Sequence, residues 1–175
     1  MKNAAWFFDD GQPFLVHNVD ALTDLDLNAL MAFHRTSGAL ATLAAHQRPT
    51  SRYLLFDRRF HLCGWQSTRP EKIRMARPPD GGAAPWPFMG VQILSPEILD
   101  KITLTPPFSL IDLYLDLAAT GETITGLPVH DARWMDVGRI EHLQRVDAVF
   151  DREYFESIPS TPRCRKPVRI PPELI

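Results

Sequence analysis

The stretch Phe14-Leu-Val-His-Asn-Val-Asp20 decides the fold, because a short apolar run leads directly to polar side chains. Such a run is typical of a strand that is covered on both faces, as in a parallel sheet. Apolar side chains at helical spacing follow over residues 27–34, and Gly38 stands where a helix would end. Residues 39–45 then predict a second buried strand. A strand, a helix and a strand within about 30 residues indicate an α/β fold.

The rest of the chain predicts further short strands and helices around this unit. We expect, in chain order, a short helix over residues 1–8, a hairpin of strands 52–56 and 60–64, a loop over 68–87, a strand over 88–94, a helix start at 95–97, a helix over 109–119, strands over 123–130 and 133–137, and a last helix after Gly138 with Ile140, Leu143, Val146 and Phe150 on one face. Residues 151–175 are rich in proline and basic side chains, so we expect a peripheral tail after a domain of residues 1–150.

Composition narrows the class of protein. The 175 residues are 45% hydrophobic and 23% charged, which is the balance of a globular chain with one core. A formal net charge of -2 offers no general attraction for nucleic acid, so we expect no such partner. The two cysteines, Cys63 and Cys164, are far apart in the sequence, which suits a reducing compartment. No apolar run approaches the roughly 20 residues of a membrane span, and we expect a soluble cytoplasmic protein with no membrane partner.

Two aspartates follow apolar strands. Asp20 closes the run that begins at Phe14, and Asp136 lies in Trp134-Met-Asp-Val-Gly138, just before a predicted helix. Ligand sites of open α/β sheets lie outside such strand ends. Two carboxylates that leave positions for waters and phosphates suit one shared Mg²⁺, whereas in the alternative interpretation each aspartate caps a neighbouring turn or helix. Alternation along the first strand puts His17 on the face opposite Asp20, so we expect them to share no metal.

Seven segments spread over residues 1–150 resemble one family. They are FLVHNVDALTDLDL, ALATLA, RYLLFD, HLCGW, FMGVQILSPEIL, FSLIDLYLDLAATGETITG and RWMDVGRIEHL, in this order. Through them the chain resembles the sugar nucleotidyltransferases, which join a nucleoside triphosphate to a sugar 1-phosphate and release pyrophosphate. Mannose-1-phosphate guanylyltransferase-like and N-acetylmuramate-1-phosphate uridylyltransferase-like members look most similar. The resemblance implies a Rossmann-like, three-layer α/β fold with a mixed, mainly parallel sheet.

The resemblance assigns roles to the two aspartates. Asp20 matches the metal-binding aspartate that ends an N-G-D or N-S-D strand in the family, and Asp136 matches the second one in its W-x-D-x-G motif. The implied cofactor is therefore Mg²⁺, and Asn18 is implied to bind substrate. The implied reaction is an in-line attack of a sugar phosphate oxygen on the nucleotide α-phosphate. Such a transfer depends on positioning and electrostatic stabilisation and requires no covalent enzyme intermediate.

Further substrate-binding residues follow from the same resemblance. Gly90 would let the backbone approach the sugar, although a bulky neighbour in the sheet explains a glycine equally well. Trp134 is implied at the substrate and also suits the core. Lys72 is the candidate for the sugar phosphate, with Arg69 and Arg74 as alternates, and the other interpretation is a solvated charged loop.

The chain departs from the family at its N-terminus. Members begin with a strand and a Gly-rich loop that ends in Pro-x-x-Lys and cradles the triphosphate, and this sequence contains no Gly-x-Gly. We therefore expect a domain that lacks this phosphate-loop unit and is inactive as this chain alone. One hypothesis is the C-terminal part of an active enzyme. The alternative is a non-catalytic remnant, a sugar-nucleotide binding or assembly module whose exposed sheet edge is covered by a second copy or a partner chain.

Overall fold

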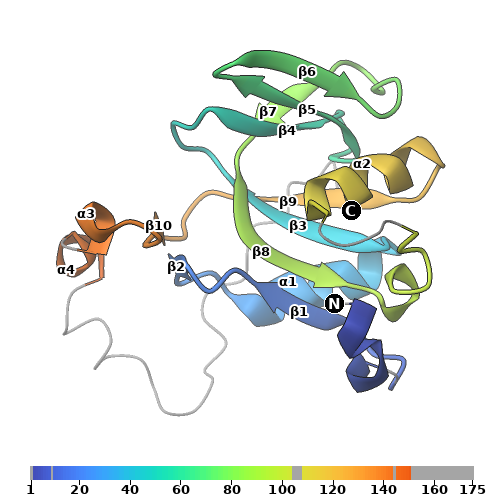
Figure 1. The fold of residues 1–175 in the computed structure, drawn as a ribbon, viewed down its shortest axis with the longest axis horizontal. Coiled ribbons are helices and arrows are strands. Elements are labelled where there is room, and N and C mark those ends of the chain that lie inside the picture. The colour runs from blue at the N-terminus through green and yellow to red at the C-terminus, as the bar shows by residue number, and fades with distance from the viewer. Residues whose placement is uncertain (1, 9, 104–107, 144, 151–175) are drawn as a thin grey trace.

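A four-stranded sheet forms the centre of the protein (Figure 1). Strands β1 (Phe14–His17), β8 (Phe88–Leu94), β3 (Ala41–His46) and β9 (Ile124–Val129) lie side by side in that order. β3 and β9 are parallel, whereas β8 is antiparallel to both β1 and β3. β1, β3 and β9 therefore run in one direction, and the predicted mixed sheet is confirmed. The computed structural model describes residues 2–8, 10–103, 108–143 and 145–150.

Helix α1 (Leu27–Ser37) covers one face of this sheet. It begins at Asp26, whose side chain accepts hydrogen bonds from two backbone amides of the first turn, and it ends at Gly38. Gly38 has a φ of 63°, the left-handed conformation in which a helix commonly ends. Leu30 and Phe33 are buried against β3 and β8. The predicted helical segment from residue 27 and its end at Gly38 are confirmed.

Helix α2 (Leu110–Ala119) covers the other face. Its first turn is capped by Ser109, whose hydroxyl accepts a hydrogen bond from the Ile111 amide at 3.2 Å. Successive side chains of a strand point to opposite faces. Accordingly, Leu43 of β3 belongs to the buried cluster that contains α2, and Ala44 belongs to the cluster that contains α1. The helices and the sheet form the three layers that the sequence predicted.

A second sheet lies beyond α2 and is antiparallel throughout. Its strands β6 (Glu71–Met75), β5 (Leu62–Thr68), β4 (Arg52–Phe56) and β7 (Ala84–Trp86) lie in that order. The predicted hairpin is confirmed as β4 and β5. The prediction of a loop over residues 68–87 is wrong, because residues 71–75 form β6, which pairs with β5 as an outer strand although all of its residues but Arg74 are exposed. Residues 84–86 of the same segment form β7, which pairs with β4.

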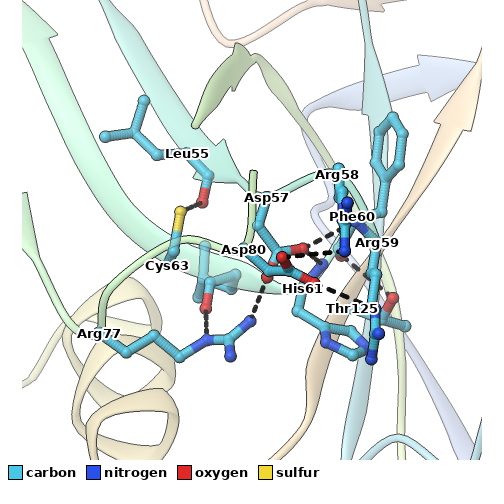
Figure 2. Close-up of polar contacts among 11 residues, drawn as sticks. Leu55, Asp57, Arg58, Arg59, Phe60, His61, Cys63, Arg77, Asp80 and Thr125 are labelled. Atoms are coloured by element: carbon cyan, nitrogen blue, oxygen red, sulfur yellow. Dashed lines mark hydrogen bonds and ion pairs between the residues drawn. The ribbon is translucent and has the colours of Figure 1, made fainter. Parts of the chain in front are cut away.

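The turn between β4 and β5 is held by a buried carboxylate (Figure 2). The Asp57 side chain is 1% exposed, and its Oδ1 accepts hydrogen bonds from the amides of Arg59 (2.9 Å) and His61 (3.0 Å). Its Oδ2 accepts a hydrogen bond from Nη2 of Arg77 at 2.7 Å. Charged acceptors in low dielectric make strong hydrogen bonds, so this turn has a fixed shape.

The same turn attaches the second sheet to the central one. The Phe60 carbonyl accepts hydrogen bonds from the Gly126 amide at 2.8 Å and from the Thr125 hydroxyl at 3.1 Å, both on β9. Phe60 has a φ of 55°, which is uncommon for a bulky residue and persists only where the surroundings fix it. The fixed turn thus covers part of the outer edge of β9.

β1 is less covered than the sequence predicted. Phe14 is buried, but the Leu15 side chain on the opposite face is 39% exposed. Within the described part of the chain β1 pairs only with β8, which lies between β1 and β3. The prediction of a strand covered on both faces is therefore wrong, because Leu15 and His17 share a face of β1 that is exposed at the edge of the sheet.

A small ribbon and two short helices lie at one end of the central sheet (Figure 1). The ribbon pairs β2 (Ala21–Thr23) with β10 (Trp134–Asp136) in antiparallel orientation. The predicted single last helix is wrong, because the chain forms α3 (Ile140–Leu143) and α4 (Val146–Val149) instead. Its predicted apolar face is also wrong at Ile140, which is 76% exposed, since no element of the described chain covers it.

The remaining elements are two short 3₁₀ helices, Lys2–Phe8 and Pro96–Ile98, where the sequence predicted a short helix and a helix start. The predicted tail, residues 151–175, lies outside the described residues. In the part of the chain that the structure describes, no helix has both the length and the apolar character needed to cross a membrane.

Candidate functional site

The two predicted aspartates meet at the ribbon. β1 ends at His17, and the following turn carries Asp20 directly into β2. Asp136, the last residue of β10, pairs with Ala21, and the Val137 amide donates a hydrogen bond to the Asp20 carbonyl at 2.8 Å. The turn follows the carboxyl end of β1, which runs parallel to β3 and β9, so this is the end of the sheet where ligands bind in open α/β folds.

Both carboxylates converge on Gly138. A Cβ atom added to Gly138 would lie 3.1 Å from Oδ1 of Asp136 and 3.1 Å from Oδ2 of Asp20. The Gly138 amide donates a hydrogen bond to Oδ1 of Asp136 at 2.8 Å. The Asp20 carboxylate is exposed and has no hydrogen-bond or ion-pair partner among the residues that the structure describes. The glycine therefore keeps open the space that both carboxylates face.

This donor set fits a hard divalent cation. Mg²⁺ binds oxygen ligands, and it commonly takes one or two protein carboxylates and keeps waters or substrate phosphates on its other positions. Within residues 2–8, 10–103, 108–143 and 145–150, no group of three or more His, Cys, Asp or Glu side chains could hold a metal ion. Two oxygen donors with an open side suit Mg²⁺ better than a metal that requires a full protein cage.

Asn18 and Gly90 are direct neighbours. The Asn18 amide donates a hydrogen bond to the Gly90 carbonyl at 2.8 Å. Gly90 has a φ of +79°, and a Cβ atom there would lie 2.9 Å from Nδ2 of Asn18. The positive φ and the close Asn18 side chain thus both require a glycine at position 90. A neighbouring residue therefore explains this glycine, which is one of the two alternatives that the sequence left open.

Trp134 is anchored rather than free. Its indole Nε1 donates a hydrogen bond to the Met89 carbonyl at 2.7 Å, and its ring is half-buried. The guanidinium carbon of Arg48 lies 3.9 Å from the ring centroid. One face and one edge of the indole are therefore occupied by protein atoms, which agrees with the alternative of a packing role.

Lys72 and its alternates are not brought to the aspartates. Lys72 is exposed on β6, the outer strand of the second sheet, and Figure 1 shows β6 well separated from the ribbon. Arg69 is exposed in the turn before β6, and Arg74 forms an ion pair with Asp112 of α2. A role of Lys72 in phosphate binding stays a prediction.

The His17 side chain is hydrogen-bonded to the backbone next to Asp20. β1 ends at His17, so strand alternation does not extend to Asp20. Nε2 of His17 donates a hydrogen bond to the Ala21 carbonyl at 2.9 Å. This hydrogen bond steadies the turn that carries Asp20.

Arg48, which follows the carboxyl end of β3, was not predicted as a site residue from the sequence. Its Nη2 donates a hydrogen bond to the Phe88 carbonyl at 2.9 Å, and its Nε is buried without a partner among the described residues. Burial lowers the pKa of Arg48, and the negative charge of Asp136 offsets only part of this shift. The rule that functional residues follow strand ends would have flagged Arg48, but nothing local indicates its contact with Trp134.

His46, the last residue of β3, was missed as well. Its Nδ1 is buried and has no hydrogen-bond partner in the described part of the chain. Burial lowers the pKa of His46, and the nearby charges of Arg48 and His130 lower it further. The carboxyl end of β3 thus brings a guanidinium and an imidazole to the end of the sheet that carries the two carboxylates.

Comparison with known proteins identifies the class. No protein-family model matches the chain. It is 28% identical over 154 residues to a UTP–glucose-1-phosphate uridylyltransferase of Synechocystis sp., covering 84% of this chain and 37% of that protein. It is 31% identical over 147 residues to an N-acetylmuramate alpha-1-phosphate uridylyltransferase of Neisseria meningitidis, covering 79% of this chain and 55% of that protein. The chain thus spans 37% and 55% of the lengths of these two relatives.

Solved structures share the fold. A putative glucose-1-phosphate thymidylyltransferase from Bacillus anthracis superposes with a TM-score of 0.63 at 15% identity, over 86% of this chain and 59% of that one. HddC from Yersinia pseudotuberculosis superposes with a TM-score of 0.55 at 21% identity, over 82% of this chain and 57% of that one. The Rossmann-like α/β fold class is confirmed.

These findings confirm the predicted resemblance: the chain is related to the sugar-1-phosphate nucleotidyltransferases over most of its length. The relatives are nucleotidyltransferases, which is the enzyme class that the resemblance implied. More narrowly, both curated relatives are uridylyltransferases that use a sugar 1-phosphate, as their names state.

Proposed function

We propose that this chain carries the metal-binding and sugar-phosphate side of a sugar-1-phosphate nucleotidyltransferase site. The observation that carries the proposal is the convergence of the Asp20 and Asp136 carboxylates at Gly138. Its place at the carboxyl end of the parallel strands and the similarity to two uridylyltransferases support it. Asp20 and Asp136 would hold one Mg²⁺, which neutralises phosphate charge when bound.

The proposed reaction is nucleotidyl transfer. An oxygen of the sugar 1-phosphate forms a bond to the α-phosphorus of the nucleoside triphosphate. The bond between that phosphorus and the oxygen bridging to the β-phosphate breaks, and pyrophosphate leaves with the electron pair. The products are a nucleoside diphosphate sugar and pyrophosphate, and no protein nucleophile takes part. We propose the cytoplasm as the location, where a thiol such as the free, buried Cys63 stays reduced.

Other residues shape the substrate side in this proposal. The exposed Asn18 side chain offers an amide donor and a carbonyl acceptor to a sugar hydroxyl. Gly90 leaves the space that Asn18 occupies, and Trp134 anchors the strand that carries Asp136. Lys72 stays the proposed contact of the sugar phosphate although it lies on β6, away from the two aspartates. Lys72→Gln should then weaken sugar-phosphate binding and leave metal binding unchanged, and unchanged sugar-phosphate binding would overturn this assignment.

Metal binding tests the proposal directly. The wild-type chain is titrated with Mn²⁺, followed by electron paramagnetic resonance, and Mg²⁺ is then added as a competitor. Asp20→Asn and Asp136→Asn should each raise the Kd for Mn²⁺ by at least about tenfold, because each removes one of two anionic ligands. Asp131→Asn is the matched control, since Asp131 is an exposed carboxylate that follows β9. A wild-type chain without saturable binding, or variants that bind as wild type, would overturn the metal assignment.

A second assay follows pyrophosphate release from nucleoside triphosphates with sugar 1-phosphates. We expect no turnover from this chain alone. Turnover that Asp20→Asn abolishes would support the reaction and overturn the expected inactivity of the isolated chain.

A second candidate function is a binding or assembly module, favoured by apolar side chains around the β1 edge. Trp6 is 74% exposed and Val19 is 99% exposed, and Phe7 and Leu15 are exposed as well. An edge strand with free backbone groups and apolar neighbours pairs readily with another chain. A second copy or a partner chain would cover this edge.

The oligomeric state tests this second candidate. Analytical ultracentrifugation over a range of concentrations should show self-association, and Leu15→Lys should weaken it because a charged edge opposes strand pairing. Ile73→Lys, on the outer strand of the second sheet, is the control. A wild-type chain that stays monomeric at all concentrations would contradict pairing between copies.

A further inference from the structure

The ribbon that carries Asp136 is too small to hold its own shape. β2 and β10 have three residues each and pair only with one another in the described part of the chain. An isolated two-stranded ribbon is marginally stable in water. The geometry of Asp136 therefore depends on contacts between the ribbon and the rest of the fold.

Contacts at the start of the ribbon are separate from those at Asp136. Arg133, before β10, binds Asp24 through its amide to Oδ1 at 2.6 Å and through Nε to Oδ2 at 3.0 Å. The Thr23 hydroxyl donates a hydrogen bond to the Arg133 carbonyl at 2.7 Å. These bonds fix the beginning of β10, three residues before Asp136, and leave its other end to other anchors.

Arg48 and Trp134 form the anchor inside β10. The Trp134 indole is bonded to the Met89 carbonyl, the Arg48 guanidinium is stacked on its ring at 3.9 Å, and Arg48 is itself bonded to the Phe88 carbonyl at 2.9 Å. Both carbonyls belong to β8 of the central sheet. A stacked, partly desolvated guanidinium contributes a cation–π attraction and a directional hydrogen bond together.

We propose that Arg48 is a positioning residue, which clamps Trp134 onto β8 and so holds Asp136 facing Asp20 across Gly138. The inference rests on the proposed metal site for its functional meaning. Its structural part, the clamping of β10, stands on the contacts of Arg48 alone. Lysine lacks the planar face and the fork of donors that this contact uses, so the proposal predicts that charge alone is not sufficient.

Hydrogen exchange at the ribbon tests the clamp. Amide exchange of residues 21–23 and 134–137 is measured in wild type, Arg48→Lys and Arg48→Met. Both variants should speed exchange in these segments about tenfold and leave the β4–β5 hairpin unchanged. Arg52→Lys is the control, since Arg52 is exposed at the start of β4. Unchanged exchange in the ribbon, or equal acceleration throughout the chain, would overturn a positioning role.

Mn²⁺ titration of the same variants separates this inference from the proposed function. If the metal site is correct, Arg48→Lys should raise the Kd for Mn²⁺ by about tenfold, the usual effect of losing a residue that orients a ligand. If Asp20→Asn and Asp136→Asn leave Mn²⁺ binding unchanged while Arg48→Lys still loosens the ribbon, the proposed function fails and the clamp stands. Loss of Mn²⁺ binding in Arg48→Lys without faster exchange of the ribbon would overturn the clamp.

Discussion

The β4–β5 turn and the β2–β10 ribbon both place aspartates beside the central sheet, but the surroundings of these carboxylates differ. Asp57 is buried, and its two oxygens accept three hydrogen bonds, one of them from the Arg77 guanidinium. The Asp136 carboxylate accepts one hydrogen bond, from the Gly138 amide, and the Asp20 carboxylate accepts none from the residues that the structure describes. The ribbon places its two carboxylates together with no direct ion pair to either among the described residues, whereas Asp57 forms an ion pair with Arg77.

The difference separates a structural carboxylate from carboxylates that are available to a ligand. A buried charge is tolerated when protein donors satisfy it, and removing those donors is strongly destabilising. Two like charges on one point repel each other unless a cation lies between them. We therefore expect Asp57 to contribute to stability and the Asp20–Asp136 pair to contribute to binding.

Replacing Asp57 should have the largest effect. Asp57→Ala leaves the Arg77 charge and two backbone amides without their acceptor, and we expect the free energy of unfolding to fall by about 3 kcal/mol. Urea denaturation followed by circular dichroism measures this change. Because Arg77 is partly exposed, water recovers some of the loss, which keeps the expected value at the lower end for a broken buried pair.

Two other variants sharpen the contrast. Asp57→Asn keeps an acceptor for the amides and loses only the charge, so its loss should be smaller than that of Asp57→Ala. Asp20→Asn should leave the free energy of unfolding within about 0.5 kcal/mol of wild type, as for other exposed positions. A loss at Asp20 as large as the loss at Asp57 would remove the distinction between the two regions.

Much of the fold could be predicted from local patterns. The buried runs of β3 and β9 and the capped helix α1 are determined by residues close together in the sequence. β6 was missed because its residues are mostly exposed and three of the five are charged, so no buried face marks the strand and only its pairing with β5 defines it. The last helix was overpredicted because helical spacing at Ile140 indicates an apolar face even where no surface covers it.

The candidate site likewise contains residues that could be predicted from the sequence and residues that could not. Asp20 and Asp136 could be named because each follows an apolar strand and matches a family motif, and the structure brings their side chains together. Arg48 could not, because its role arises from a contact with Trp134 on a distant segment. Gly90 could be named, but only the structure shows that Asn18 fills the space beside it.

A pair of glycine variants tests whether the ribbon is built for binding. Gly138→Ala places a methyl group 3.1 Å from both carboxylate oxygens, so we expect about tenfold weaker Mn²⁺ binding. Gly38→Ala is the control, because nothing lies within 4 Å of its Cβ position, but its φ of +63° is unfavourable for alanine. It should reduce stability by about 1 kcal/mol and leave Mn²⁺ binding unchanged. Equal Mn²⁺ affinity in wild type and Gly138→Ala would contradict a shared site.

His34 is a buried group whose hydrogen-bond partners are neutral. Replacing it should have the smallest effect of these substitutions. The Ser95 hydroxyl donates to the Ala39 carbonyl, so it accepts from Nε2 of His34, and Nδ1 then accepts from the Thr42 hydroxyl. Burial lowers the pKa of His34, the charge of Glu97 opposes this, and the charge of Arg35 adds to it.

Because the folded protein resists protonation of His34, the unfolded chain binds the proton first as the pH falls below its ordinary pKa of 6.5. The free energy of unfolding should therefore decrease between about pH 7.5 and about pH 5.5, as urea denaturation at each pH would measure. His34→Gln should make this decrease shallower without abolishing it, since burial also lowers the pKa of His46 and His61. An equally steep decrease in His34→Gln would show that His34 contributes nothing to this pH dependence, and that its hydrogen bonds to the neutral hydroxyls of Thr42 and Ser95 do not favour the uncharged imidazole.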